Sequence, residues 1–593
     1  MGNQDKRERR KGNGSGILRS VSISSIVFAL VTSMSYFSAS VIYKSESFQI
    51  TISRSMIYSS ARNSIFAFIL IFACTRFIYW CFDTILFQNA SFMPEMNRTP
   101  NTDWRVYWLN TRNRTTLTAS MKKHFLPYLL IILAVWSAWI AISWPGSLRD
   151  DTIAQLLQSS GAHKYYTQHP LFDTLIFSIF WNAGSVLGNT AFGLALYTLF
   201  QAIALAAGYA FLLCYLRRSG IPRLVSLLTL LYGTCNYLVF GAVTTMGKDT
   251  FHTIFLLPLA VLFVEACMTR GKVLQRKLVL ASFVLLSTCS IASKRTALIV
   301  FLLSMIILLG ISKSVRRYVV VALLGSILLA QFVWNPIAIA ATGADESPSR
   351  EIAGYFTQPI GRVQAKDPQS ITAEERSLLE PVMDVVKAGE VYNPSRYDET
   401  MFTYRIDSST HDKFQAMKAW VSIGLKNPTE YIKAYTAVFY NWFNPRATFT
   451  YPTGVSYVFT PVYMDQWYTY SHSKQTIDTV LAPLRAVPPP SGWRLKVTQA
   501  VTRIVQGSPF FSLGLYVTFI PLFIGIYLIR RKSWMSLAAW SFLAFNVLSC
   551  YASTALFWYS IPLFFILPLF CSLPFMKPRY EQISSLLRAN RIQ

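Results

Sequence analysis

The segment from Ser143 to Leu171 reads SWPGSLRDDTIAQLLQSSGAHKYYTQHPL and separates two long apolar parts of the chain. It places the adjacent carboxylates Asp150 and Asp151 after a Pro-Gly turn, and a helical pattern and a His-Pro pair follow. Acidic side chains are costly near a bilayer, so a pair just beyond an apolar span indicates a functional site. The alternative is a solvated helix N-terminus, whose dipole favours carboxylates. The two interpretations are compatible with each other.

The composition is that of a polytopic membrane protein. Of the 593 residues, 53% are hydrophobic and only 14% are charged, against about 25% charged in soluble domains. The net charge of +27 lies mainly outside residues 342–509, which hold 17 basic and 16 acidic residues. The excess therefore sits in short loops and the N-terminal tail, as expected for cytoplasmic loops. This distribution argues against nucleic-acid binding.

A bilayer crossing needs about 20 apolar residues. On this criterion we predict twelve spans, at about 17–43, 64–88, 124–144, 191–216, 224–243, 250–268, 278–292, 296–312, 318–341, 510–529, 533–551 and 556–576. A further apolar run, 171–187, is expected to lie in the membrane interface as a helix. With that choice both termini become cytoplasmic, and so do all the basic loops, at 217–223, 269–277, 313–317 and 530–532.

Residues 342–509 form the one soluble-looking region, which this topology places on the outer face. Turn signals alternate there with helical periodicity near 373–388 and 411–441. About 168 residues suffice for a small core. We expect a mainly helical extracytoplasmic domain.

Three charged pairs fall at the outer ends of predicted spans. They are Asp150 with Asp151, Lys248 with Asp249, and Lys294 with Arg295. Carboxylates beside cations fit an enzyme in which a carboxylate takes a proton from a hydroxyl and cations hold a phosphate. The alternatives are an exposed salt-bridged loop for the Lys248 pair and an interfacial anchor for the Lys294 pair.

His169 precedes Pro170, which favours an extended conformation before the interfacial helix. A single histidine there is more often a structural hydrogen-bonding group than a ligand. Its neighbours do not have the spacing of a metal site.

These motifs resemble the GT-C-type membrane glycosyltransferases. The shared elements are the helix ending Trp144-Pro145-Gly146, then Asp151-Thr152, Gln155 and His169-Pro170-Leu171. The chain is closer still to a group of uncharacterised bacterial membrane proteins in that superfamily. The later motifs that resemble this group are Lys248-Asp249, the Lys294-Arg295 turn and the segment Gln358-Pro359-Ile360-Gly361-Arg362-Val363. The similarity covers most of the chain after about residue 120.

The resemblance implies an inverting glycosyltransferase of the bacterial plasma membrane. Such an enzyme moves a sugar from a polyprenyl-phosphate donor to an envelope glycan, lipid or protein on the outer face. It implies Asp151 as base with Asp150 beside it, and donor-phosphate binding by Lys248, Lys294 and Arg295. Further candidates are Gln155, His169, Asp249, Gln358 and Arg362. Some GT-C enzymes use a divalent metal, and the residues here leave metal use open.

The chain departs from the group at Arg149-Asp150 and at Ser293-Lys294-Arg295, where less charged residues and an Arg-Asn-type turn are usual. The first departure leaves the choice of the base between Asp150 and Asp151 open. We divide it into a cytoplasmic tail, two spans with a cytoplasmic loop, a GT-C-like core with catalytic loop 145–170, an extracytoplasmic domain, C-terminal spans and a second tail. The boundaries are 1–16, 17–123, 124–341, 342–509, 510–576 and 577–593.

Two other classes remain. A lipid-linked glycan transporter or flippase would show internal repeats and helices broken at the midplane, and we see neither in the sequence. A non-catalytic envelope scaffold would scatter the charged residues. An enzyme should instead bring Asp151, Asp249 and Arg295 together.

Overall fold

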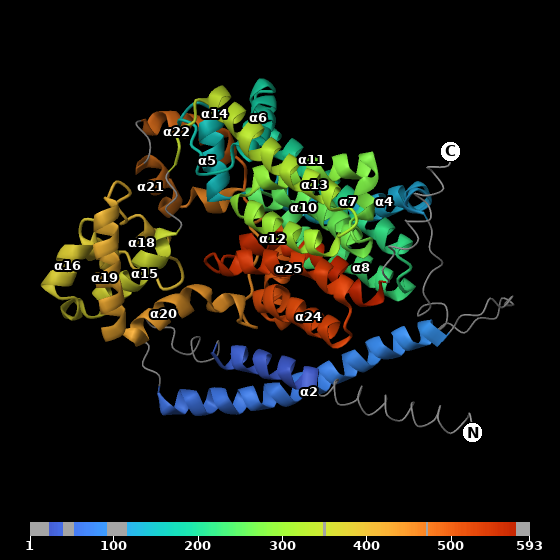
Figure 1. Cartoon of the computed structure of the whole chain (residues 1–593). Helices are drawn as coiled ribbons and strands as arrows, with labels where there is room; N and C mark the ends of the chain where they lie inside the picture. Colours follow the sequence, from blue (N-terminus) through green and yellow to red (C-terminus); the bar gives the residue numbers. More distant parts are fainter. Residues whose placement is uncertain (1–22, 39–52, 92–115, 348–351, 470–472, 577–593) are drawn as a thin grey trace.

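The computed structural model describes residues 23–38, 53–91, 116–347, 352–469 and 473–576. The predicted tails at 1–16 and 577–593 lie outside these ranges. Regular structure in the described residues is almost entirely helical, with one pair of two-residue strands (Figure 1). The chain is therefore an all-α membrane protein, as its composition predicts.

Within the described residues, seven helical segments are long and apolar enough to cross a membrane. They are α2 (Arg54–Ser91), α4 (Leu117–Ser143), α7 (Thr190–Arg218), α10 (Lys248–Met268), the continuous run of α13 (Arg316–Ile327), η2 (Leu328–Trp334) and α14 (Asn335–Thr342), α25 (Trp534–Tyr551), and the run of η8 (Phe557–Ser560), α26 (Ile561–Cys571) and η9 (Leu573–Phe575).

Shorter apolar helices occupy the remaining predicted spans. They are Ile23–Ser38, α11 (Lys277–Ser293), α12 (Arg295–Ile311), and η7 (Leu515–Phe519) with α24 (Ile520–Arg530). The segment 224–243, expected as one span, is two helices, α8 (Arg223–Cys235) and α9 (Tyr237–Val243), bent by 48°. The bend falls at Asn236, whose side chain accepts a hydrogen bond from the Leu238 amide and so begins a new helix. Helices thus lie at all twelve positions, and twelve crossings remain a prediction.

The centre of the membrane part is formed by α10 and α26. Helix α10 packs against α7, α11, α25 and α26, and every residue of α26 from Ile561 to Phe570 is buried. A helix that is apolar on all sides belongs inside a bundle. By contrast α2 lies at the periphery (Figure 1), tied to α24 by an ion pair of 2.8 Å between Asp83 and Arg530.

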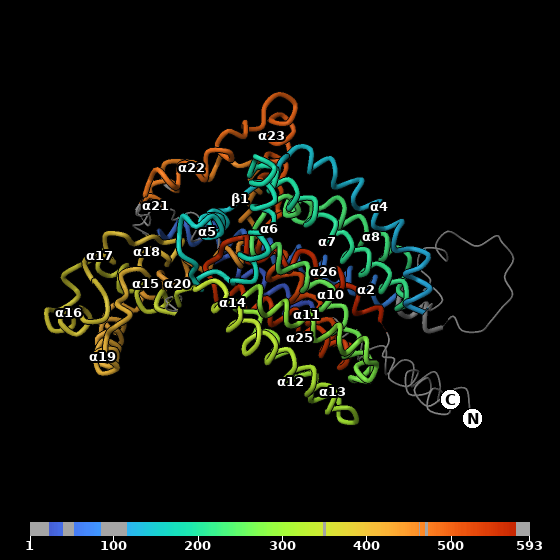
Figure 2. The backbone as a smooth tube through the Cα atoms, turned by 90° about the horizontal axis from the view of Figure 1, so that it is seen from above, coloured from blue at the N-terminus to red at the C-terminus, as the bar shows by residue number. Residues whose placement is uncertain are grey.

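Helix α6 (Leu171–Val186) has 16 residues and is too short to count among the seven. It packs against α7 and against α5 (Asp150–Ser159). The interfacial placement predicted for it remains a prediction. Its contacts hold α5 at one end of the membrane helices, beside α21 (Pro461–Thr469) and α22 (Lys474–Arg485) (Figures 1 and 2).

The region 342–509 is helical, as expected. Its helices are α15 (Ala353–Lys366), η3 (Pro368–Ser370), α16 (Ala373–Leu379), α17 (Val385–Glu390), α18 (Asp398–Met401), α19 (Thr410–Lys426), α20 (Pro428–Phe439), η4 (Tyr440–Trp442), η5 (Ser456–Phe459), α21 (Pro461–Thr469), α22 (Lys474–Arg485), α23 (Gly492–Gln506) and, at its end, η6 (Pro509–Phe511). Most of them pack in two groups, whereas Trp442 of η4 and Val505 of α23 join the core of the membrane part. Helices α15, α16, α17, α19 and α20 share a core of their own, whereas η5, α21 and α22 share a core with α5, α6 and α7.

Candidate functional site

Two charged turns are brought together by the strand pair β1 (Ser147–Leu148) and β2 (Thr245–Met246). The strands are parallel, with Ser147 opposite Thr245 and Leu148 opposite Met246. The next residues along each strand therefore lead into the Arg149-Asp150-Asp151 turn and the Gly247-Lys248-Asp249 turn side by side. The Thr152 hydroxyl donates to the Met246 carbonyl at 2.7 Å and fixes α5 against β2.

The turn that precedes β1 requires glycine at position 146. Gly146 has φ of +131°, and a Cβ there would lie 2.2 Å from the Thr198 hydroxyl oxygen. That hydroxyl donates to the Pro145 carbonyl at 3.0 Å. The turn is thus held against α7, and it sets the point at which α5 starts.

Arg149 lies between three carboxylates. Its guanidinium is 3.6 Å from Asp150, 3.6 Å from Asp151 and 3.5 Å from Asp249. Only 8% of its side chain is exposed, so these attractions are weakly screened by water. Arg149 connects the two turns electrostatically, a role that the sequence analysis did not assign to it.

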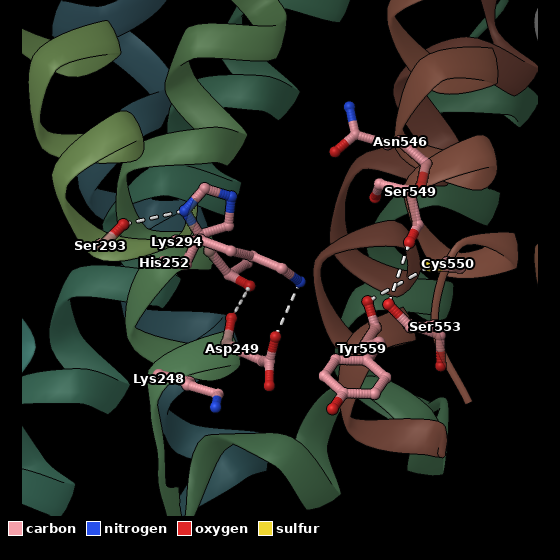
Figure 3. Close-up of polar contacts among 12 residues, drawn as sticks. Lys248, Asp249, His252, Ser293, Lys294, Asn546, Ser549, Cys550, Ser553 and Tyr559 are labelled. Atoms are coloured by element: carbon pink, nitrogen blue, oxygen red, sulfur yellow. Dashed lines mark hydrogen bonds and ion pairs between the residues drawn. The ribbon is translucent and has the colours of Figure 1, made fainter. Parts of the chain in front are cut away.

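Two lysines complete the cluster. Lys248 Nζ lies 2.9 Å from Asp151 Oδ2, and Lys294 Nζ lies 2.7 Å from Asp249 Oδ1. Lys294 is an extended residue between α11 and α12, and this break turns its side chain towards α10. Next to it, His252 Nδ1 and Ser293 Oγ are 2.9 Å apart and join α10 to α11 (Figure 3).

Aromatic rings from η8 cover the cations. The Trp558 ring centroid lies 4.4 Å from the Arg149 guanidinium carbon, and the Tyr559 centroid lies 5.8 Å from Lys294 Nζ. Figure 3 shows Tyr559 on the helices opposite Lys294. Such contacts stabilise a cation without neutralising it. The sequence analysis did not predict either ring, because aromatic residues at the start of a span, here 557–560, indicate only an interfacial aromatic belt.

The two carboxylates of α5 have opposite pKa shifts. Burial and the charge of Asp151 raise the pKa of Asp150. Burial alone would raise the pKa of Asp151 as well, but Lys248, Arg149 and His169 outweigh it and hold that pKa well below its usual value. Two adjacent carboxylates in different environments are a pattern found at acid–base sites.

His169 borders the cluster on the α6 side. Its Nε2 lies 4.0 Å from Asp151 Oδ1, and burial lowers its pKa to about 4, so the ring is neutral near pH 7. Arg295 donates a hydrogen bond to the Thr167 carbonyl, two residues before His169. Asp151 and Asp249 thus meet in one cluster, and Arg295 is fixed to the loop that carries His169.

Gln155 is buried beneath the cluster, where it donates to the Thr174 hydroxyl at 3.0 Å. Gln358 and Arg362 are not brought to the cluster. Arg362 is buried and bonds Glu430 at 2.9 Å, and Gln358 donates to the Asn393 carbonyl at 2.8 Å. Both side chains brace helices inside the 342–509 region.

That region nevertheless reaches the cluster at two other residues. Burial alone would lower the pKa of Arg396, but Asp398, Glu399 and Asp150 together raise it. Burial raises the pKa of Tyr457, on which the charges of Arg149 and Asp150 also act. Gln358 supports the loop that carries Arg396, because its partner Asn393 lies three residues earlier. The described residues contain no group of three or more His, Cys, Asp or Glu arranged to hold a metal ion.

The sequence model of a family of unknown function, DUF6020, matches residues 162–585. The chain belongs to this family. The match includes Lys248, Asp249, Lys294 and the η8 rings, and it starts after the Arg149-Asp150-Asp151 turn. No curated protein and no solved structure matches this DUF6020 member.

Proposed function

We propose that this DUF6020 protein is a GT-C-like membrane glycosyltransferase. It uses a polyprenyl-phosphate sugar as donor and a hydroxyl of an envelope glycan, lipid or protein as acceptor. The observation that carries the proposal is the cluster in which Lys248 contacts Asp151 and Lys294 contacts Asp249, with Arg149 between the turns. The cluster lies at the end of the spans that the charge distribution assigns to the outer face.

The cations suit a phosphate that joins a sugar to a lipid. Arg149, Lys248 and Lys294 come from three elements, and each lies against at least one carboxylate of the cluster. A phosphate arriving there gains charge-assisted hydrogen bonds from Lys and Arg, and its developing negative charge is stabilised as the sugar departs. The rings of Trp558 and Tyr559 cover Arg149 and Lys294.

Asp151 is the residue proposed as base. Lys248 Nζ holds its Oδ2 at 2.9 Å, which keeps the carboxylate ionised but weakly basic. A donor phosphate competes for Lys248 and Arg149, and the loss of these contacts makes Asp151 more basic. The base therefore becomes active when the donor is bound.

The reaction is a single displacement. The acceptor hydroxyl oxygen forms a bond to the anomeric carbon while the bond from that carbon to the phosphate oxygen breaks. The leaving oxygen keeps the bonding electrons as polyprenyl phosphate, and the acceptor proton passes to Asp151. The anomeric configuration is inverted because attack and departure occur on opposite faces. Asp150 adjusts the basicity of Asp151 through like-charge repulsion.

The test uses purified protein in lipid nanodiscs with a set of polyprenyl-phosphate sugars. Mass spectrometry follows the release of polyprenyl phosphate. We expect consumption of at least one donor in the presence of envelope extract. Full survival of every donor at an enzyme concentration of about 1 μM over a day would overturn the proposal, because typical turnover is about 1–10³ per second.

A further inference from the structure

A cavity of about 530 Å³ lies between η5, α21 and α22. Its size falls within the range of about 300–1,000 Å³ typical of small-ligand sites. The lining comprises Val455, Ser456, Phe459, Pro461, Met464, Asp465, Tyr468, Arg485, Val487 and Pro489. None of these residues has a place in the cluster around Asp151.

The polar side of the cavity is held in place by a local network. Arg485 bonds Asp478 at 2.7 Å and the Tyr468 hydroxyl at 3.0 Å, and Tyr468 donates to Asp478 at 2.6 Å. Arg485 also lies over the Phe459 ring, with its guanidinium carbon 5.7 Å from the centroid. The lining is therefore preorganised, which lowers the cost of binding.

The chemistry of the lining selects a neutral, hydroxyl-bearing ligand. Asp465 and Arg485 belong to the lining, Asp478 bonds Arg485 at 2.7 Å, and Lys474 Nζ lies 4.3 Å from the centroid of the Tyr468 ring. The two acidic and two basic groups balance, so no net charge attracts an anion or a cation. The Phe459 and Tyr468 rings and two proline rings offer flat apolar faces. A sugar ring combines an apolar C–H face with hydroxyl groups that bond a carboxylate and a guanidinium.

The position of the cavity relates it to the charged cluster. Val455, Val458 and Met464 share a hydrophobic core with Leu148 and Ile153, which flank the Arg149-Asp150-Asp151 turn. Tyr457 follows the lining residue Ser456 and lies within the electrostatic reach of Asp150. Figures 1 and 2 both place α21 and α22 beside α5.

We infer that this cavity binds a sugar residue of the acceptor glycan, with Phe459 and Tyr468 against its ring and Asp465 and Arg485 bonding its hydroxyls. The inference rests on the proposed function, because only a glycosyltransferase has an acceptor. It names the acceptor class as a glycan and excludes a bare lipid or peptide. An acceptor held at η5 extends towards Asp150 and Asp151 past Tyr457.

The experiment is binding of the detergent-purified full chain to an array of immobilised oligosaccharides, with no donor present. We expect the wild type to bind a defined subset, and Tyr468→Ala and Asp465→Asn to lose at least about tenfold in affinity, equal to 1.4 kcal/mol. Tyr468→Phe keeps the ring and should retain most of the binding. Asp407→Asn and Phe414→Ala alter exposed residues elsewhere in the region and should bind like the wild type.

Absence of binding to every glycan, or unchanged binding by folded Asp465→Asn and Tyr468→Ala, would overturn the inference. Competition by a polyprenyl-phosphate sugar would assign the cavity to the donor and overturn it as well. The array needs no turnover, so its result is separate from the donor-consumption test. A protein that binds glycans but consumes no donor would refute only the proposed function.

Discussion

Lys248 and Asp151 lie on two turns almost 100 residues apart in sequence, yet their charged atoms are 2.9 Å apart. The parallel register of β1 and β2 creates this contact, because each turn leaves its strand at the same level. The pair is accordingly a property of the fold, and removing either partner has a defined consequence.

Lys248→Ala should weaken donor binding more than it weakens turnover. In the proposed mechanism, the substitution removes a cation that contacts the phosphate in both the ground state and the transition state. We expect the KM for the donor to rise by about tenfold, in line with a charged hydrogen bond of about 1.5–3 kcal/mol. Steady-state kinetics would show this, with Lys387→Ala, an exposed lysine, as the control. An unchanged donor KM would exclude Lys248 from phosphate binding.

Trp558→Leu should impair the site by releasing Arg149. The ring covers the guanidinium at 4.4 Å, and such a contact contributes about 0.5–2 kcal/mol. We expect a fall in donor turnover of about twofold to thirtyfold, whereas Trp558→Phe should retain part of the activity. Trp534→Leu, an exposed tryptophan at the start of α25, is the control. Equal activity of the Leu variant and the wild type would show that the stacking has no catalytic effect.

His169 makes the stability of the protein depend on pH. Its folded pKa of about 4 lies below its ordinary value of 6.5, so the unfolded chain binds more protons between these values. The free energy of unfolding therefore falls as the pH drops from about 6.5 to about 4.

Melting temperatures in detergent across that range measure the effect. His169→Gln should flatten the dependence, and His411→Gln, at an exposed position, should leave it unchanged. Parallel curves for His169→Gln and the wild type would contradict the assignment.

The predicted topology can be tested at the loop that follows α10. Gly271 is unsuitable as a reporter position, since its φ is +77° and a Cβ would lie 2.5 Å from the Ser312 hydroxyl oxygen. Arg276 in the same loop is exposed. Arg276→Cys should resist membrane-impermeant thiol reagents in intact cells and react after lysis. Modification in intact cells, above the level of the parent chain, would place the loop outside and refute the shared outer face.

The sequence predicts the helical membrane fold well, since apolar runs of the required length leave few alternatives. The sequence analysis did not predict the bend at Asn236, because one polar capping residue hardly changes the mean hydropathy of an apolar run. The way in which 342–509 divides between a core of its own and cores shared with the membrane part also depends on contacts distant in sequence. Such contacts leave no periodic signal.

For the candidate site, sequence reasoning identified the charged pairs but not the way they connect. Asp150, Asp151, Lys248, Asp249 and Lys294 do meet. The sequence does not tell which way the Arg149 side chain points. Its burial between the two turns follows from the register of β1 and β2. Gln358 and Arg362 were predicted as site residues because they belong to a motif. Their hydrogen bonds instead hold helices together inside the 342–509 region.

The central claim is that Asp151 takes the proton of the acceptor. The most direct measurement is single-turnover transfer from a consumed polyprenyl-phosphate sugar by the wild type, Asp151→Asn, Asp150→Asn and the control Asp407→Asn. We predict that Asp151→Asn loses about 10²–10⁴-fold in rate while it still binds donor, that Asp150→Asn is affected less, and that Asp407→Asn matches the wild type. Near-normal transfer by a folded Asp151→Asn protein would contradict the account.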